Sequence, residues 1–153
     1  MKIKIISIGN SSPKSIQDIL FKYTSRFVDH FKIELLEIKS EKKFKSVEQK
    51  KLQEAQKILK LVGTDFIVSL DENGSSCSSI GLSEKLSNWM QNFPKVTFII
   101  GGADGLDKKI IEKSNWVWSL SELTLPHNLV KVILVEQIYR ASTILNNHPY
   151  HRE

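Results

Sequence analysis

Two patterns of apolar residues, one typical of strands and one typical of helices, alternate along this chain. Short segments rich in apolar residues, typical of strands, occur at 2–8, 32–38, 65–70, 96–100 and 116–120. The segments after these runs carry apolar residues three or four positions apart, which is the spacing of one helix face. Strict alternation of strands and helices predicts an α/β fold, in which a mostly parallel sheet carries helices on both faces.

The predicted helices are marked by their apolar positions and, in two cases, by their first residues. Ser12 and Pro13 predict a capped helix start, and Ser46 and Gln49 have the spacing of a capping box. The charged stretch 40–46 is predicted to be an exposed loop. The helical positions are Ile16, Leu20, Tyr23 and Phe27; Leu52, Ala55, Leu59 and Val62; Leu82, Leu86, Trp89 and Phe93; and those of helices expected at 107–113 and from Pro126.

The last predicted helix, 127–145, is apolar on nearly every side. A helix of this kind needs cover on two sides, which one domain of this size seldom provides. We therefore expect a homodimer through this helix, with a central helix buried inside one subunit as the alternative. The stripe expected on the sheet is Val130, Ile133, Leu134, Ile138, Ala141 and Leu145, and the stripe expected at the subunit contact is Leu129, Val132, Val135 and Tyr139.

Length and cysteine content indicate a single domain over residues 1–153 in a reducing compartment. A domain of this size buries roughly 68–70% of its unfolded surface, so it needs no disulfide or metal. Cys77 is the only cysteine and has no internal partner. The sequence has neither a signal-peptide pattern nor an apolar run of the roughly 20 residues that span a membrane. We expect a cytoplasmic protein without a membrane partner.

The net charge of +5 favours an anionic partner such as nucleic acid. Of the 22 basic residues, all but Arg26, Arg140 and Arg152 are lysines, and a lysine-rich composition alone could produce this excess. Arginine contacts phosphates and bases with two parallel hydrogen bonds, which lysine cannot do. Arg140 and Arg152 therefore carry more weight as candidate contacts.

Three loops lie where ligands bind in open α/β sheets, beyond the carboxyl ends of the strands. They are DENGSS after the third strand, GGADG after the fourth and SELTLP after the fifth. Gly101 and Gly102 permit close approach of a ligand or a positive φ. The alternative is that these glycines and Gly105 simply form a tight strand-to-helix turn.

Other chemistries fit the sequence poorly. The GGADG loop matches neither GxGxxG nor a P-loop. The turn 9–15 could hold a phosphate, as in flavodoxin-like proteins, but Pro13 removes a backbone donor there. His148 and His151 lack the additional ligands of a zinc site, so no metal is expected. The absence of a G-x-S-x-G motif leaves a hydrolase unsupported.

Three blocks in order resemble the RlmH family of SPOUT methyltransferases: FIIGGADGL at 98–106, WSLSELTLPHNLVKVILVEQIYRA at 118–141 and NHPYHRE at 147–153. The similarity extends over the whole chain, including the N-terminal KIKIISIG. It implies methylation of N3 of a pseudouridine in 23S ribosomal RNA with S-adenosyl-L-methionine. It also implies a homodimer with a trefoil knot over about 70–145 and a C-terminal tail, 146–153, with 23S rRNA, the large ribosomal subunit or the ribosome as partner.

The resemblance also assigns residues to a cofactor pocket and favours close approach of the ligand as the reason for Gly101 and Gly102. Such a pocket would hold adenine between apolar side chains, while backbone groups hydrogen-bond to its edge. The implied cofactor-binding residues are Leu70, Gly101, Gly102, Ser121, Glu122, Leu123, Thr124, Leu125 and Pro126.

The catalytic candidates are His151 and Arg152, in the tail. Arg152 would stabilise charge on the uracil edge or on a phosphate, and His151 would accept or relay a proton, with simple RNA binding as the alternative for each. Tyr150 could stack on a splayed base. Lys131 stands where family members usually carry Arg, so a phosphate contact there would lose its bidentate geometry. The expected RNA-contacting residues are Lys131, Glu136, Arg140, His148, Tyr150, His151 and Arg152.

Two alternatives to this function remain open at the level of sequence. One is a flavodoxin-like nucleotide- or RNA-binding module without catalysis, and the other is a SPOUT methyltransferase with a different RNA target. Because the tail follows the helix expected to form the dimer, one active site could combine the tail of one subunit with the cofactor pocket of the other.

Overall fold

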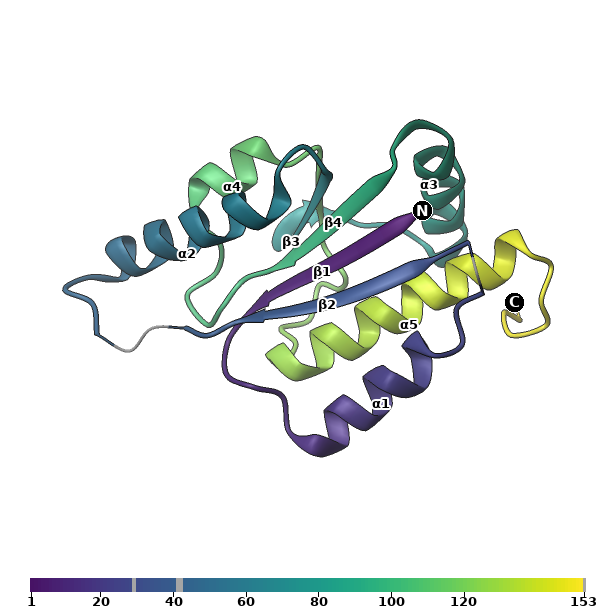
Figure 1. Cartoon of the computed structure of the whole chain (residues 1–153), viewed down its shortest axis with the longest axis horizontal. Coiled ribbons are helices and arrows are strands. Elements are labelled where there is room, and N and C mark those ends of the chain that lie inside the picture. Colours follow the sequence, from purple (N-terminus) through teal and green to yellow (C-terminus); the bar gives the residue numbers. More distant parts are fainter. Residues whose placement is uncertain (29, 41–42, 153) are drawn as a thin grey trace.

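A computed structural model of the protein describes residues 1–28, 30–40 and 43–152. Within these residues, strands and helices alternate along the chain as predicted (Figure 1). The elements are β1 (Lys2–Ile8), α1 (Lys14–Thr24), β2 (Lys32–Ile38), α2 (Val47–Val62), β3 (Phe66–Ser75), α3 (Ser79–Asn92), β4 (Lys95–Ile100), α4 (Lys108–Lys113), β5 (Trp116–Trp118) and α5 (His127–Leu145).

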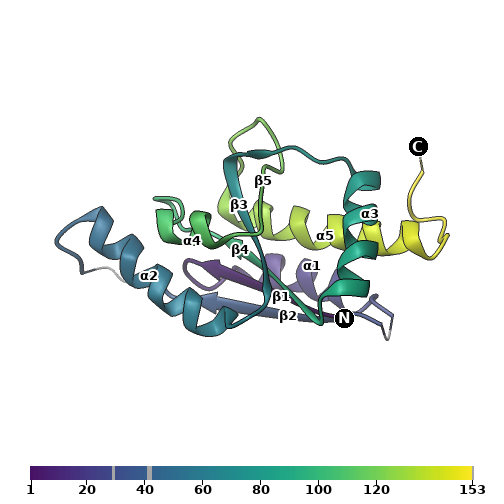
Figure 2. The same ribbon diagram turned by 90° about the horizontal axis from the view of Figure 1, so that it is seen from above.

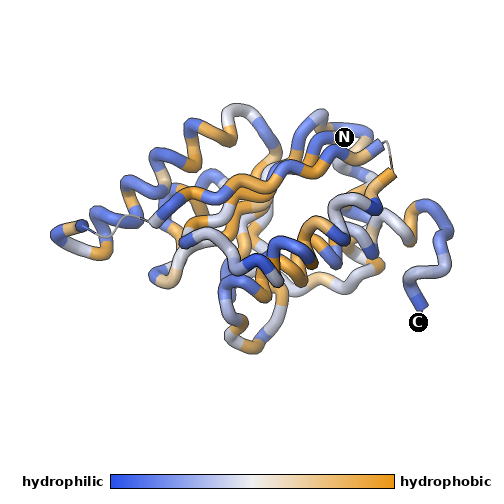
Figure 3. The backbone as a smooth tube through the Cα atoms, turned by 60° about the horizontal axis from the view of Figure 1, so that its bottom comes forward, coloured by the Kyte–Doolittle hydropathy of each residue, from blue (hydrophilic) through white to orange (hydrophobic). Residues whose placement is uncertain are grey.

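The five strands form one sheet in the order β2-β1-β4-β3-β5, and every neighbouring pair is parallel. Side chains alternate between two cores: Ile5 joins α1, α3 and α5 on one face, whereas Ile6 joins α2 and α4 on the other. Figures 1 and 2 show these two helical layers, and Figure 3 shows the strands as a central hydrophobic band. The predicted α/β class, with helices on both faces, is confirmed.

One of the two predicted helix caps is present and the other is not. The Ser46 hydroxyl accepts a hydrogen bond from the Gln49 backbone N–H, which confirms the cap of α2. The Ser12 prediction is wrong: Pro13 occupies the N-cap position of α1 and makes no side-chain cap bond. The buried Ser12 hydroxyl donates instead to Glu37, 2.7 Å away.

Strand β3 is longer than predicted and β5 is shorter. The sequence predicted a turn after Leu70, but β3 continues to Ser75 and pairs again with Trp118 across an irregularity in register. A Cβ atom on Gly74 would lie 2.7 Å from the Trp118 carbonyl carbon. The extension therefore needs glycine at position 74, where β3 approaches the backbone of β5.

The charged stretch 40–46 lies only partly within the described residues. Lys43, Lys45 and Ser46 are exposed, as predicted, whereas residues 41 and 42 lie outside the described part of the chain. Among the described residues, no helix is long and apolar enough to cross a membrane.

Helix α5 buries more of its surface within one chain than predicted. Leu134, Ile138 and Ala141 pack on the sheet, as expected. Val135 and Tyr139, which were assigned to a subunit contact, are also buried, and the Tyr139 ring contacts Tyr23 of α1. That part of the prediction is wrong because α1 covers this side of α5. Of the proposed contact stripe, Leu129 is the most open, with 45% of its surface exposed.

Candidate functional site

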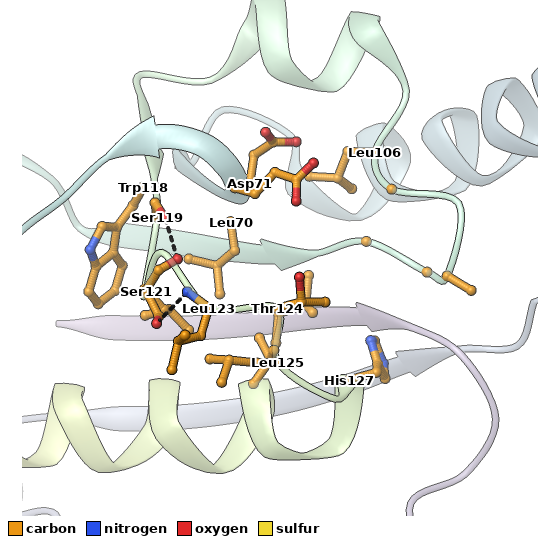
Figure 4. Close-up of a pocket in the computed structure, with 18 of the residues that line it drawn as sticks. Leu70, Asp71, Leu106, Trp118, Ser119, Ser121, Leu123, Thr124, Leu125 and His127 are labelled. Carbon is orange, nitrogen blue, oxygen red and sulfur yellow. Dashed lines mark hydrogen bonds between the residues drawn. The ribbon is translucent and has the colours of Figure 1, made fainter.

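The three segments selected from the sequence border one cavity of about 630 Å³, which is lined by Leu70, Asp71 and Glu72 within β3 and by the loops after β4 and β5 (Figure 4). This volume lies within the roughly 300–1,000 Å³ range of small-molecule sites. Strand register brings the loops together, because Leu70 of β3 pairs with Ile100 of β4 and with Trp118 of β5. Parallel strands end at the same edge, so the residues that follow them meet there.

Almost all the predicted cofactor-binding residues line this cavity. Figure 4 shows side chains of the loop 119–126 opposite those at the end of β3 and after β4. Pro126 is the exception: it does not line the cavity but precedes α5 as its N-cap residue. The predicted residues that do line it are Leu70, Gly101, Gly102, Ser121, Glu122, Leu123, Thr124 and Leu125.

Gly101 and Gly105 of the GGADG loop are explained by the turn itself. A Cβ atom on Gly101 would lie 3.0 Å from the backbone of Gly105 and Leu106, and Gly105 has a φ of 76°. The Gly105 N–H also donates to the Gly102 carbonyl at 3.0 Å. Ligand approach is therefore not needed to account for Gly101, and the tight-turn alternative describes this loop better.

The cavity is acidic although the chain as a whole is basic. Asp71, Glu72, Asp104 and Glu122 line it, and none of the lining residues, all of which the structure describes, is Lys or Arg. Asp104 receives a 2.7 Å contact from Lys50 outside the cavity. The apolar part of the wall includes Leu70, Trp118, Leu125 and Val130. This arrangement suits a ligand that has both an apolar portion and positive charge.

The loop 119–126 is shaped by its own hydrogen bonds. The Ser121 hydroxyl accepts from the Leu123 N–H at 2.9 Å, and the Ser119 hydroxyl donates to the Ser121 carbonyl at 3.0 Å. Leu123 is left 74% exposed at the loop tip. Ser121, a predicted cofactor-binding residue, therefore also stabilises the loop through its hydroxyl oxygen.

His127 lines the cavity and was missed as a site residue. Its Nε2 atom is buried without a hydrogen-bond partner and packs against Gly9. Burial lowers the pKa of His127, as does the nearby charge of Lys131, although Glu37 and the Gly101 carbonyl act in the opposite direction. The sequence feature that could have identified His127 is its position directly after the loop SELTLP.

Lys131 does not lie where an RNA contact requires it. Only 4% of its surface is exposed, and its Nζ atom donates to Glu37 at 2.6 Å and to Ser12 at 2.9 Å. Burial would raise the pKa of Glu37, but hydrogen bonds from Lys131 and Ser12 lower it overall. The predicted phosphate contact of Lys131 does not fit this geometry, because its ammonium group faces inward and is occupied.

Glu136, Arg140 and Tyr150, three predicted RNA-contacting residues, form a separate cluster with one another. Glu136 accepts hydrogen bonds from Arg140 at 2.5 Å and from the Tyr150 hydroxyl at 3.0 Å. The Arg140 guanidinium also lies 4.8 Å from the centre of the Tyr150 ring. Burial raises the pKa of Tyr150, as do its contacts with Tyr23 and Glu136, so it remains a neutral donor.

The remaining tail residues lie around this cluster. His148 and Arg152 are exposed, and the His148 Nδ1 atom accepts from the Tyr150 N–H at 3.2 Å. Both ring nitrogens of His151 are buried, without a hydrogen-bond partner among the described residues. Among the described residues, no three His, Cys, Asp or Glu side chains gather as metal ligands.

The cavity and the tail lie at opposite ends of α5 (Figures 1 and 2). His127 and Val130 line the cavity at the start of the helix, whereas the tail begins after Leu145. The 19 residues of α5 span about 28 Å at roughly 1.5 Å per residue. Within one chain, the predicted catalytic residues are therefore far from the predicted cofactor pocket.

A parallel sheet with a ligand-sized cavity at the carboxyl ends of its strands defines a ligand-binding α/β protein. A family model described as "Predicted SPOUT methyltransferase" matches residues 1–151. Two curated relatives named "Ribosomal RNA large subunit methyltransferase H" are 43% identical over 155 residues (Methylobacillus flagellatus) and 42% identical over 157 residues (Hydrogenovibrio crunogenus), each over 100% of both chains. The chain belongs to this family, the RlmH family of SPOUT methyltransferases.

A solved structure supports the fold independently of close sequence similarity. A "probable methylase family protein" from Haemophilus influenzae aligns with a TM-score of 0.60 at 15% identity. The alignment covers 99% of this chain and 70% of the other. At this level of identity, the match supports the arrangement of sheet and helices alone.

Proposed function

We propose that this protein transfers a methyl group from S-adenosylmethionine to N3 of a pseudouridine in 23S ribosomal RNA, in the cytoplasm. The observation that carries the proposal is the acidic, partly apolar cavity in a chain of the RlmH family. S-adenosylmethionine combines an adenine ring with a cationic sulfonium and an amino-acid end that carries one ammonium and one carboxylate group, so its net charge is positive. The apolar wall suits the ring, and the carboxylates of Asp71, Glu72 and Glu122 suit the positive charges, whereas Asp104 is already paired with Lys50.

The proposal includes the chain topology implied by the family. Residues 1–153 would form one domain, with the trefoil knot over about 70–145 and the tail at 146–153; Glu153 lies outside the described residues. The cavity would then be built mainly from loops of the knotted segment. Three loops that meet at one edge of the sheet support this arrangement.

Bound S-adenosylmethionine would supply an electrophilic methyl group, and the chain would have to orient the base and remove its N3 proton. In our proposal the tail moves when RNA binds, so that His151, whose ring nitrogens are buried in this structure, accepts this proton. Exposed Arg152 stabilises the negative charge left on the uracil edge. Tyr150 is a poor candidate for the proton acceptor, because its raised pKa keeps the phenol protonated. Its ring, held by Arg140 and Glu136, would fix the tail.

We further propose that the working enzyme is a homodimer through α5 and that each active site combines two subunits. The supporting observation is the length of α5, which separates the tail from the cavity of the same chain. A tail delivered by a second copy would remove this separation. The partner would be 23S rRNA, free or within the large subunit or ribosome.

Nucleoside analysis of ribosomal RNA tests the function directly. In cells that lack the protein, we expect one N3-methylated pseudouridine to disappear from 23S rRNA and to return on expression of the wild-type chain. Loss of a methyl group from another RNA would favour a SPOUT enzyme with a different target. Unchanged methylation everywhere, with no binding of S-adenosylmethionine, would favour a non-catalytic binding module.

A further inference from the structure

A polar cluster formed by Lys131, Glu37 and Ser12 lines a second cavity, next to the start of α5. The Lys131 ammonium group donates to Oε1 of Glu37 and to the Ser12 hydroxyl, and that hydroxyl donates to the same carboxylate oxygen. The three contacts close a triangle of 2.6, 2.9 and 2.7 Å. The Lys131 side chain is 5% exposed and that of Glu37 is 33% exposed.

The cluster joins three segments that are far apart in the sequence. Lys131 belongs to the second turn of α5, Glu37 lies near the end of β2, and Ser12 belongs to the turn between β1 and α1. Lys131 is 94 residues from Glu37 and 119 from Ser12. The ion pair therefore ties the end of β2 to the start of α5, and the hydrogen bonds of Ser12 add the turn after β1.

The same turn also touches the cavity wall. A Cβ atom on Gly9 would lie 3.1 Å from Nε2 of His127, and a Cβ atom on Gly102 would lie 3.3 Å from the Ile8 side chain. Both His127 and Gly102 line the cavity. His127 precedes Lys131 by four residues, so both side chains lie on one face of α5. A shift at Lys131 would thus reach the wall through the helix and through the turn.

Packing alone does not explain a lysine at this position. Placing a charge in a protein interior is costly, and apolar residues of similar size often stabilise a fold as well or better. A charged cluster adds directionality, because each hydrogen bond fixes both the distance and the angle between two segments. These segments are the ones that support His127 and the Gly101–Gly102 wall.

We infer that the Lys131–Glu37–Ser12 cluster is a positioning device that holds the wall of the cofactor cavity in its binding geometry. Lys131 and Glu37 act through His127 and the turn 9–12, without touching the ligand. This inference rests on the proposed function only for the identity of the ligand, S-adenosylmethionine.

The chain offers a matched control in a second enclosed ion pair. Lys4 lies 3.1 Å from Asp65, with side chains 13% and 6% exposed, and no residue of this pair lines the cavity. Lys131→Met and Lys4→Met therefore remove equivalent charges, one beside the cavity and one away from it. Lys131→Arg retains the charge, and an adjacent cavity of about 390 Å³ gives its larger side chain room.

Calorimetric titration of each purified variant with S-adenosylmethionine tests the inference. We expect Lys131→Met to weaken binding by about tenfold or more, because small displacements of positioning groups have large effects. The rate of methyl transfer at saturating cofactor should change far less, so KM rises while kcat is largely retained. Lys131→Arg should restore binding, and Lys4→Met should lower the unfolding temperature without changing affinity.

Wild-type affinity in Lys131→Met, or equal weakening in Lys4→Met, would overturn the inference. If Lys131→Met does not fold, Glu37→Gln removes the paired charge with little change in shape and should weaken binding in the same direction.

Hydrogen exchange of the loop 119–126 tests the inference without any ligand. Faster exchange in the Lys131 or Glu37 variant than in Lys4→Met supports positioning, and equal exchange contradicts it. A wild-type protein that binds no S-adenosylmethionine but shows this difference would contradict the proposed function alone.

Discussion

At the scale of single residues, the environment of a side chain matters more than its type. Lys131 looks like a surface cation in the sequence, but its ammonium group is buried against Glu37 and Ser12. His127 looks like the first residue of a helix, but its ring forms part of the cavity wall. No local pattern predicts either role, because the partners lie more than ninety residues away along the chain.

We predict that the pKa of His127 is below its ordinary value and rises in Lys131→Met, because a nearby positive charge is removed while Glu37 remains. NMR titration of the ring protons measures this value, and the Lys4→Met protein is the control. A histidine whose pKa is lowered by folding binds its proton more readily when unfolded, so its contribution to stability is lost as the pH falls below about 6.5. An unchanged pKa in Lys131→Met would show that the two groups do not interact.

At the scale of elements, the sequence predicts those whose signals are local. The strands 2–8 and 32–38 match β1 and β2, and the Ser46 cap begins α2 where expected. The extension of β3 to Ser75 was missed, because the polar residues there are typical of a turn. Their pairing partner, β5, is distant in the sequence and becomes evident only in the structure. The burial of Val135 and Tyr139 was missed for the same reason, since helix periodicity does not say which neighbour covers a face.

The β3–β5 contact leads to a prediction about stability. Gly74→Ala should lower the free energy of unfolding by about 1–3 kcal/mol, because the new methyl group would meet the backbone of Trp118 and Ser119. Ser76→Ala, at an exposed position two residues along, should change it by less than about 0.5 kcal/mol. Urea unfolding measures both values. Equal stability of the two variants would mean that β5 can move away from β3 at little cost.

At the scale of the whole molecule, α5 connects the cavity to the C-terminal tail: residues at its start form part of the cavity wall, and the tail follows its end. The sequence predicted which loops form the cavity, because segments that follow parallel strands must meet at one edge of the sheet, and the resemblance to the RlmH family supplied the individual residues. It could not predict that Glu136, Arg140 and Tyr150 hold one another, since the tail must first fold back along the helix. In our proposal, a second subunit brings the two ends together.

Methyl transfer by mixed dimers tests this proposal most directly. Leu125→Arg would block the cavity with bulk and charge, and Arg152→Ala would disable the tail. If each site combines two subunits, a dimer of these two variants retains one intact site and should be active. A dimer of the wild-type chain with a chain carrying both substitutions should be inactive. Activity in the second dimer and none in the first would contradict the account, because each subunit would then complete its own site.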